Sequence, residues 1–295
     1  MSETTPISAE EHRTRIRDNV GVAQPCHRSR ITTPTGVELY CRHWGTGRPV
    51  VFVSSWGFSS KMWCYQMQFL GALGMHCVAF DRRGHGQSDQ PTQGYDMNTL
   101  AGDLAAVIEK LELRDVVLVG HSMGGAEIVR YLALHGSARI AKVVLLAPLT
   151  PFFRQTPDNP NGVPEQDLAA LRALWATDFP KWVEDNKRAF FVSETSQDTM
   201  AWLINDMLGM FVPVLIECNQ SLVNTDLRAD LATVDRPTLI LHGDVDVSAP
   251  LEITGRPTAA GIAGAVLKVY PGAPHGLFLT HSQQVNADLE AFICD

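Results

Sequence analysis

The chain lacks the features that mark membrane, disulfide-stabilised and nucleic-acid-binding proteins. No apolar run approaches the roughly 18 residues needed to span a membrane, so we expect no membrane partner. The formal net charge of −8 argues against nucleic acid as a partner, because nucleic-acid-binding surfaces are basic. The six cysteines form no C-x-x-C pair, and their scatter favours free, buried thiols in a reducing compartment: Cys26, Cys41, Cys64, Cys77, Cys218 and Cys294.

The amino-terminal segment also lacks the apolar stretch of a secretory signal. Met1–Asn19 is polar and charged, so we expect a soluble, cytoplasmic protein. We interpret residues 1–27 as an N-terminal extension with a short helix at Ala9–Arg17. The 295 residues, 45% hydrophobic and 19% charged, can bury a core without disulfides or a metal.

Short apolar runs alternate with helical patterns along most of the chain. This alternation predicts an α/β fold, with a mostly parallel central sheet flanked by helices. The runs from Pro49–Ser54 onward are typical of strands buried on both faces. The expected strands are Arg28–Thr33, Val37–Trp44, Pro49–Ser54, Met75–Phe80, Val116–Val119, Lys142–Ala147, Thr238–His242 and Val266–Tyr270. The expected helices are Met62–Leu73, Asn98–Leu111, Ala126–His135 and Gln283–Phe292.

The alternation stops between residues 151 and 232. A proline-rich loop opens this segment, and no convincing strand follows. We therefore divide the chain into a core, residues 28–150 and 233–295, and a helical cap, residues 151–232. The helical stretches of the cap are Leu168–Ala176, Lys181–Phe190, Thr199–Met210 and Pro213–Val223.

A candidate nucleophile lies in Gly120-His121-Ser122-Met123-Gly124. An apolar strand precedes this G-x-S-x-G motif and a helical pattern follows it, which is the arrangement of a nucleophile elbow. The glycines on either side of Ser122 leave room for a tight turn that lifts the hydroxyl above the sheet.

A serine needs a base, and the base needs an orienting acid. After a nucleophile elbow, the acid is expected beyond a late strand and the base beyond the last strand. Asp244 and Asp246 compete for the acid, and we favour Asp246 because Asp244 is placed to brace the loop. His275, in a turn-rich loop after the last strand, is the predicted base. The other histidines near the site, His121, His242 and His281, are interpreted as structural or as outsiders.

An oxyanion hole requires two backbone N–H donors. Met123, directly after the nucleophile, is one expected donor. Phe58 is the other, in the loop after the third strand, Ser54–Phe58, which we call the oxyanion loop.

The chain resembles the α/β-hydrolase superfamily and, within it, the cofactor-free haloperoxidase and aryl-esterase (perhydrolase) group. The resemblance extends from about Arg28 to Ile293. It is carried by the elbow, by Asp81-Arg82-Arg83-Gly84-His85-Gly86-Gln87-Ser88, by His242-Gly243-Asp244 with Asp246 and Pro250, by Gly272-Ala273-Pro274-His275-Gly276, and by Ala147-Pro148 and Asp158-Asn159-Pro160-Asn161-Gly162.

One position departs from the family pattern. Trp56-Gly57 stands where the family usually carries His-Gly, so an indole replaces an imidazole. We expect this change to alter packing beneath the oxyanion loop and to leave the backbone donor intact.

The resemblance implies a serine hydrolase that cleaves carboxylic esters of small apolar or aryl substrates through an acyl-enzyme, without a metal or organic cofactor. Perhydrolase or haloperoxidase chemistry is an expected side activity. A lactonase, a carbon–carbon-bond hydrolase and a ligand-binding receptor with a slow triad stay open as alternatives, as does assembly into homo-oligomers. The expected substrate-binding residues are Trp56, Phe152, Trp202, Met210, Phe211, Val247 and Leu277.

Overall fold

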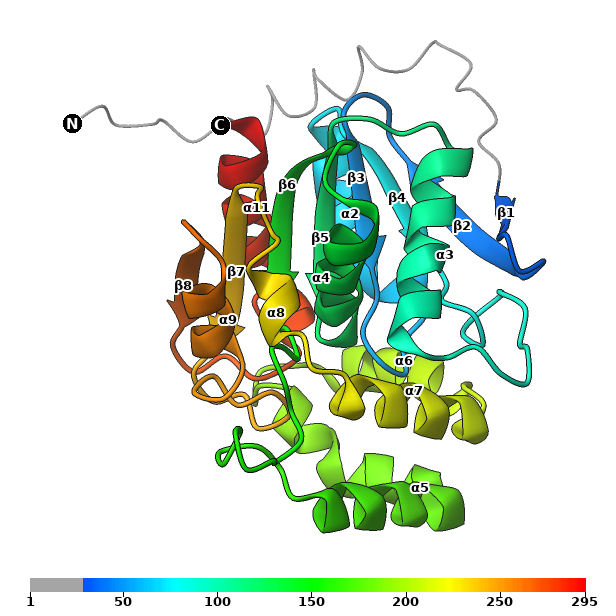
Figure 1. The fold of residues 1–295 in the computed structure, drawn as a ribbon, viewed down its shortest axis with the longest axis vertical. Coiled ribbons are helices and arrows are strands. Elements are labelled where there is room, and N and C mark those ends of the chain that lie inside the picture. The colour runs from blue at the N-terminus through cyan, green and yellow to red at the C-terminus, as the bar shows by residue number, and fades with distance from the viewer. Residues whose placement is uncertain (1–28) are drawn as a thin grey trace.

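A computed structural model describes residues 29–295, which form one eight-stranded sheet in the order β1-β2-β4-β3-β5-β6-β7-β8 (Figure 1). The six strands from β4 to β8 in this order run parallel, and β1 and β2 are antiparallel to their neighbours. The predicted extension, with its helix at Ala9–Arg17, lies outside the described residues. The strands are β1 Arg30–Thr32, β2 Glu38–Trp44, β3 Pro49–Val53, β4 His76–Phe80, β5 Val116–His121, β6 Ile140–Leu146, β7 Thr238–Gly243 and β8 Val266–Tyr270.

Helices cover both faces of the sheet, as the alternation predicts. On one face α3, α4, α8 and α9 pack side by side, and on the other α2 lies beside α11 (Figure 1). Strand β3 shows why its sequence is wholly apolar. Val51 and Val53 pack with the α3–α4 side, whereas Val50 and Phe52 pack with the α2–α11 side. These helices are α2 Cys64–Ala72, α3 Met97–Lys110, α4 Met123–His135, α8 Arg228–Leu231, α9 Gly255–Gly261 and α11 Ser282–Cys294.

Three details differ from the sequence-based expectation. The predicted helix Met62–Leu73 is split into a 3-10 turn, η1 Ser60–Trp63, followed by α2. Helices α8 and α9 and the four-residue α10, Leu277–Thr280, are absent from the sequence-based expectation. Strand β8 is not buried on both faces, and Val266 is 52% exposed. Because β8 is the last strand in the order, it has a neighbour on one side only within the described sheet.

The segment between β6 and β7 is helical and adds no strand to the sheet. Its helices α5, α6 and α7 lie beyond the carboxyl ends of the parallel strands (Figure 1). Helix α5 is broken at Asp178, whose side chain accepts a hydrogen bond from the Lys181 N–H just after Pro180. We call residues 151–232 the insert; it contains α5 Glu165–Asn186, η2 Lys187–Phe190, α6 Gln197–Leu208, α7 Val212–Asn224 and α8.

Among residues 29–295, no single helix is both long enough and apolar enough to cross a membrane. The pair α6 and α7 meets that length and composition only when taken together, across a bend of 88°.

Candidate active site

Ser122 lies on a sharp turn between β5 and α4. Its φ of 54° and ψ of −117° are strained for a residue with a side chain. Neighbouring glycines make the turn sterically feasible, since a Cβ on Gly124 would lie 2.2 Å from the Val53 carbonyl oxygen. One on Gly120 would lie 2.7 Å from the Gly124 carbonyl oxygen. The strand–turn–helix that the motif predicts is therefore present, with Ser122 at its apex.

The predicted base and acid are in direct contact. His275 Nδ1 lies 2.7 Å from Asp246 Oδ2, and both side chains are buried. The other carboxylate oxygen of Asp246 accepts hydrogen bonds from the Ser248 N–H at 2.9 Å and the Ala249 N–H at 2.8 Å. Because both oxygens are held, the carboxylate can fix one orientation and one tautomer of the imidazole.

The charge of Asp246 is stabilised by its surroundings. Burial alone would raise the pKa of this carboxyl, but the charge of His275 and hydrogen bonds from His242, His275 and Ala249 outweigh it. The pKa of Asp246 therefore lies well below its ordinary value. Asp244, the competing aspartate, accepts a hydrogen bond from the Gly272 N–H at 2.7 Å, as expected for a residue that braces the loop.

Two further histidines hold these loops in place. His121 Nε2 lies 2.8 Å from the carbonyl oxygen of His275, and His242 Nε2 lies 2.8 Å from that of Ala249. Burial, followed by the charge of His275, places the pKa of His121 well below its ordinary value. His121 is therefore neutral and donates its Nε2 proton to the His275 carbonyl. His281 contacts Tyr270 and takes no part in this network.

The loop after β3 carries the donors that an oxyanion hole requires. Within residues 29–295, the backbone N–H groups of Trp56, Gly57 and Phe58 have no protein acceptor, and neither has that of Met123. Phe58 is thus one of three free donors on this loop, and its selection stays a prediction. Close packing of Gly124 on the end of β3 brings the loop next to the elbow.

Two carboxylates hold the far end of this loop. Asp81 accepts hydrogen bonds from the Ser60 N–H at 2.7 Å and the Gln87 N–H at 2.8 Å. Asp206, on α6 of the insert, accepts from the Ser59 N–H at 2.8 Å and from its hydroxyl at 2.9 Å. Asp81 belongs to a motif that the sequence offers, whereas nothing in the sequence points to Asp206.

Trp56 packs against the insert as well as against the core. Its Nε1 donates to the Leu215 carbonyl at 2.8 Å, and its ring centroid lies 4.6 Å from that of Trp175. The indole therefore anchors the loop to α5 and α7 of the insert. The departure from the family pattern gives no sign of this contact with the insert, and the expected change of packing beneath the loop stays a prediction.

The structure does not bring the predicted substrate-binding residues into one group. Leu277 is buried in the core, and Met210 is buried between the helices of the insert. Phe152 packs under the Arg228 guanidinium. Trp202 lies against Tyr65 near the surface, with ring centroids 6.4 Å apart. The remaining two, Phe211 and Val247, are 52% and 66% exposed.

Sequence reasoning missed Phe190 of η2. Its ring centroid lies 5.6 Å from those of both His275 and Phe58, and its carbonyl accepts from the Gly276 N–H. Phe190 is the aromatic residue of the insert that packs on the predicted base. The helical pattern over Lys181–Phe190 gives no sign that the chain turns down onto the core at this point.

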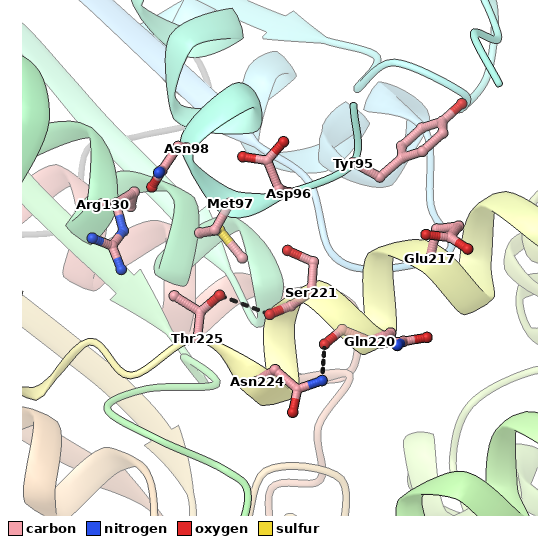
Figure 2. A pocket seen from close by; sticks show the side chains of 10 residues that line it. All are labelled: Tyr95, Asp96, Met97, Asn98, Arg130, Glu217, Gln220, Ser221, Asn224 and Thr225. Atoms are coloured by element: carbon pink, nitrogen blue, oxygen red, sulfur yellow. Dashed lines mark hydrogen bonds between the residues drawn. The ribbon is translucent and has the colours of Figure 1, made fainter. Parts of the chain in front are cut away.

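A separate hollow of about 510 Å³ opens between the start of α3 and helix α7 (Figure 2). Most of its lining residues have polar side chains, among them Asp96, Arg130 and Glu217. It contains none of Ser122, Asp246 and His275. This hollow is therefore distinct from the site built around the elbow.

Buried His85 predicts acid sensitivity. Burial, then the charge of Arg82, lowers the pKa of His85 to about 3, whereas an unfolded histidine titrates near 6.5. The unfolded chain therefore binds the extra proton between these values, so stability is full above about pH 6.5 and falls as the pH drops. We expect His85→Gln to reduce the pH dependence of the unfolding free energy by about 1.4 kcal/mol per pH unit.

Urea unfolding of both proteins at pH 4.5, 5.5 and 6.5 measures this slope. Unfolding at pH 7.5, where the imidazole is neutral in both states, gives the baseline cost of the substitution. The prediction would be contradicted if the unfolding free energies of wild type and variant changed with pH to the same extent.

Comparison with known proteins identifies the family. Residues 50–288 match the alpha/beta hydrolase family. The chain belongs to this family. It is 38% identical over 270 residues to a non-heme haloperoxidase of Rhodococcus erythropolis, covering 89% of this chain and 98% of the relative. It is 35% identical over 277 residues to a bifunctional esterase/perhydrolase of Acinetobacter calcoaceticus, with the same two coverages.

A solved structure shows the same architecture. An esterase from Exiguobacterium antarcticum superposes on this α/β hydrolase with a TM-score of 0.87 and 31% sequence identity. The match covers 90% of this chain and 99% of the other. The predicted fold class and the resemblance to the haloperoxidase-like group are confirmed.

Proposed function

We propose that this α/β hydrolase is a serine hydrolase that cleaves carboxylic esters of small apolar or aryl substrates. The observation that carries the proposal is the His275–Asp246 contact of 2.7 Å in a chain whose Ser122 occupies a strained elbow. The esterase and haloperoxidase relatives support the same chemistry.

In the proposed mechanism, His275 Nε2 takes the proton of Ser122 while the hydroxyl oxygen attacks the ester carbonyl. The N–H groups of Met123 and Phe58 stabilise the oxyanion. His275 then protonates the leaving alcohol, and an acyl-enzyme remains on Ser122. Water, activated by the same imidazole, releases the acid and restores the serine. Asp246 holds the tautomer and stabilises the imidazolium.

We further propose that the insert, residues 151–232, is a cap that selects the substrate. It reaches the site through Phe190, which packs on His275, and through Asp206 and Leu215, which bind the oxyanion loop. The aromatic and aliphatic side chains between its helices favour an apolar acyl or aryl group over a charged one.

Perhydrolysis is a second candidate activity, favoured by the names of the relatives. Hydrogen peroxide in place of water would release the acyl-enzyme as a peracid, which can oxidise halide in solution. Peracid formation from a short-chain ester and hydrogen peroxide tests this activity separately from hydrolysis.

Hydrolysis of p-nitrophenyl acetate, propionate and butyrate tests the proposed function directly. We expect many turnovers per enzyme, with the rate depending on acyl length. The same assay on lactones and on a diketone separates ester cleavage from the alternatives. A single slow turnover would favour a receptor, and activity on the diketone alone would favour carbon–carbon cleavage.

A further inference from the structure

Two buried ion pairs follow strand β4. Arg82 pairs with Glu127 of α4, and Arg83 pairs with Asp103 of α3. All four side chains are at most 3% exposed. Because a buried ion pair loses much hydration energy, its presence is weak evidence for stability. The two pairs differ in what else each guanidinium binds.

Arg82 binds the start of the oxyanion loop. Its Nε donates to Glu127 at 2.6 Å, its Nη1 to the Ser55 carbonyl at 3.1 Å and its Nη2 to the Ser54 carbonyl at 2.6 Å. The planar guanidinium makes these bonds in a fixed geometry, which an ammonium group cannot do.

The Ser55 carbonyl shares one rigid peptide plane with the Trp56 N–H. Arg82 therefore fixes the direction of that N–H, the first of the free donors on the loop. A second effect of Arg82 comes from its ion pair with Glu127. Glu127 lies on α4, the helix that begins at Met123, so one guanidinium links the loop to the helix that supplies the other expected donor.

Arg83 makes no such link. Its guanidinium binds Asp103 at 2.6 and 2.7 Å and the Thr35 hydroxyl at 3.2 Å. These partners belong to α3 and to the turn between β1 and β2, and their hydrogen bonds within residues 29–295 do not reach the oxyanion loop, although the charge of Asp103 acts on Glu127. The neighbouring pair is thus a matched control with the same chemistry and the same burial.

We propose that Arg82 and Glu127 are positioning residues that set the oxyanion loop against the N–H of Met123. Since this role rests on the proposed ester hydrolysis, wild-type turnover is measured first. A second readout, inhibition by an aryl trifluoromethyl ketone, needs no turnover, because the ketone forms a tetrahedral adduct with Ser122 whose oxyanion occupies the same hole.

The test compares Arg82→Lys with Arg83→Lys. Both variants keep the positive charge and lose the planar guanidinium with its fixed set of N–H donors. Loss of one oxyanion donor costs ~10²–10³ in rate, so we expect a misaligned loop in Arg82→Lys to lower kcat at least about tenfold. KM should change less than about twofold, because the loop acts on the transition state. The affinity for the ketone should fall by the same factor as kcat. Arg83→Lys should change kcat and the affinity for the ketone by less than about twofold, whatever its effect on Tm.

Equal losses of kcat in the two variants, or unchanged ketone affinity in Arg82→Lys, would overturn the positioning role. If Arg82→Lys does not fold, Glu127→Gln replaces it on the same two readouts, with Arg83→Lys kept as the control because Asp103→Asn would remove a charge that acts on Glu127. Absence of ester turnover by the wild type would refute the proposed function, while ketone affinities would still decide the role of Arg82.

Discussion

Replacement of Ser122 by alanine is expected to abolish ester turnover. Without the hydroxyl no acyl-enzyme can form, and loss of a triad nucleophile costs on the order of 10⁴-fold or more in kcat. Binding of a substrate analogue should persist, because the expected oxyanion donors belong to the backbone. We expect the variant to fold as the wild type does, because the side chains of serine and alanine differ only by the hydroxyl oxygen. Steady-state kinetics on p-nitrophenyl acetate and thermal unfolding measure the two properties.

A serine elsewhere provides the control. Ser221 lies on α7 in the separate hollow shown in Figure 2, and Ser221→Ala should leave turnover unchanged. A Ser122→Ala protein that retains more than about a hundredth of wild-type turnover would exclude Ser122 as the nucleophile, because the residual rate of such variants lies far lower.

The parts of the site that the sequence predicts are those held by local geometry. The elbow depends on glycines within two residues of Ser122, so its conformation can be predicted from residues that are close together in the sequence. The Asp246–His275 contact spans 29 residues, yet each partner lies just beyond its own strand. Because β7 and β8 are parallel neighbours, the residues that follow them are brought to the same edge of the sheet.

The parts that the sequence does not predict depend on packing between distant segments. In the sequence, Trp56 stands out only as a departure from the family pattern. The orientation of its indole is set by a hydrogen bond to the carbonyl of Leu215, 159 residues away. Phe190 reaches His275 only because the chain turns at η2. Arg82 belongs to a motif, and only the fold shows that its guanidinium meets Glu127 and the oxyanion loop together. No periodicity in the sequence records these contacts.

Asp246→Asn is expected to lower kcat by about 10⁴-fold while leaving the fold in place. The Asp246 oxygen that accepts from Ser248 and Ala249 would become the amide oxygen of asparagine, because backbone N–H groups require an acceptor. The amide NH₂ would then face His275 Nδ1 and force the imidazole proton onto Nε2. In that tautomer Nε2 cannot accept the proton of Ser122, so the base is lost although every residue stays in position.

Asp244→Asn is the matched control two residues away. Asp244 accepts one backbone hydrogen bond, from Gly272, and an amide oxygen can accept it equally well. Turnover should therefore stay within about twofold of wild type, as for a substitution that leaves all buried contacts intact. Comparison of kcat for the two variants on the same aryl ester, with Tm as the measure of folding, assigns the acid. A larger loss in Asp244→Asn than in Asp246→Asn would transfer that role to Asp244, because the charge that stabilises the imidazolium would then reside on the other aspartate.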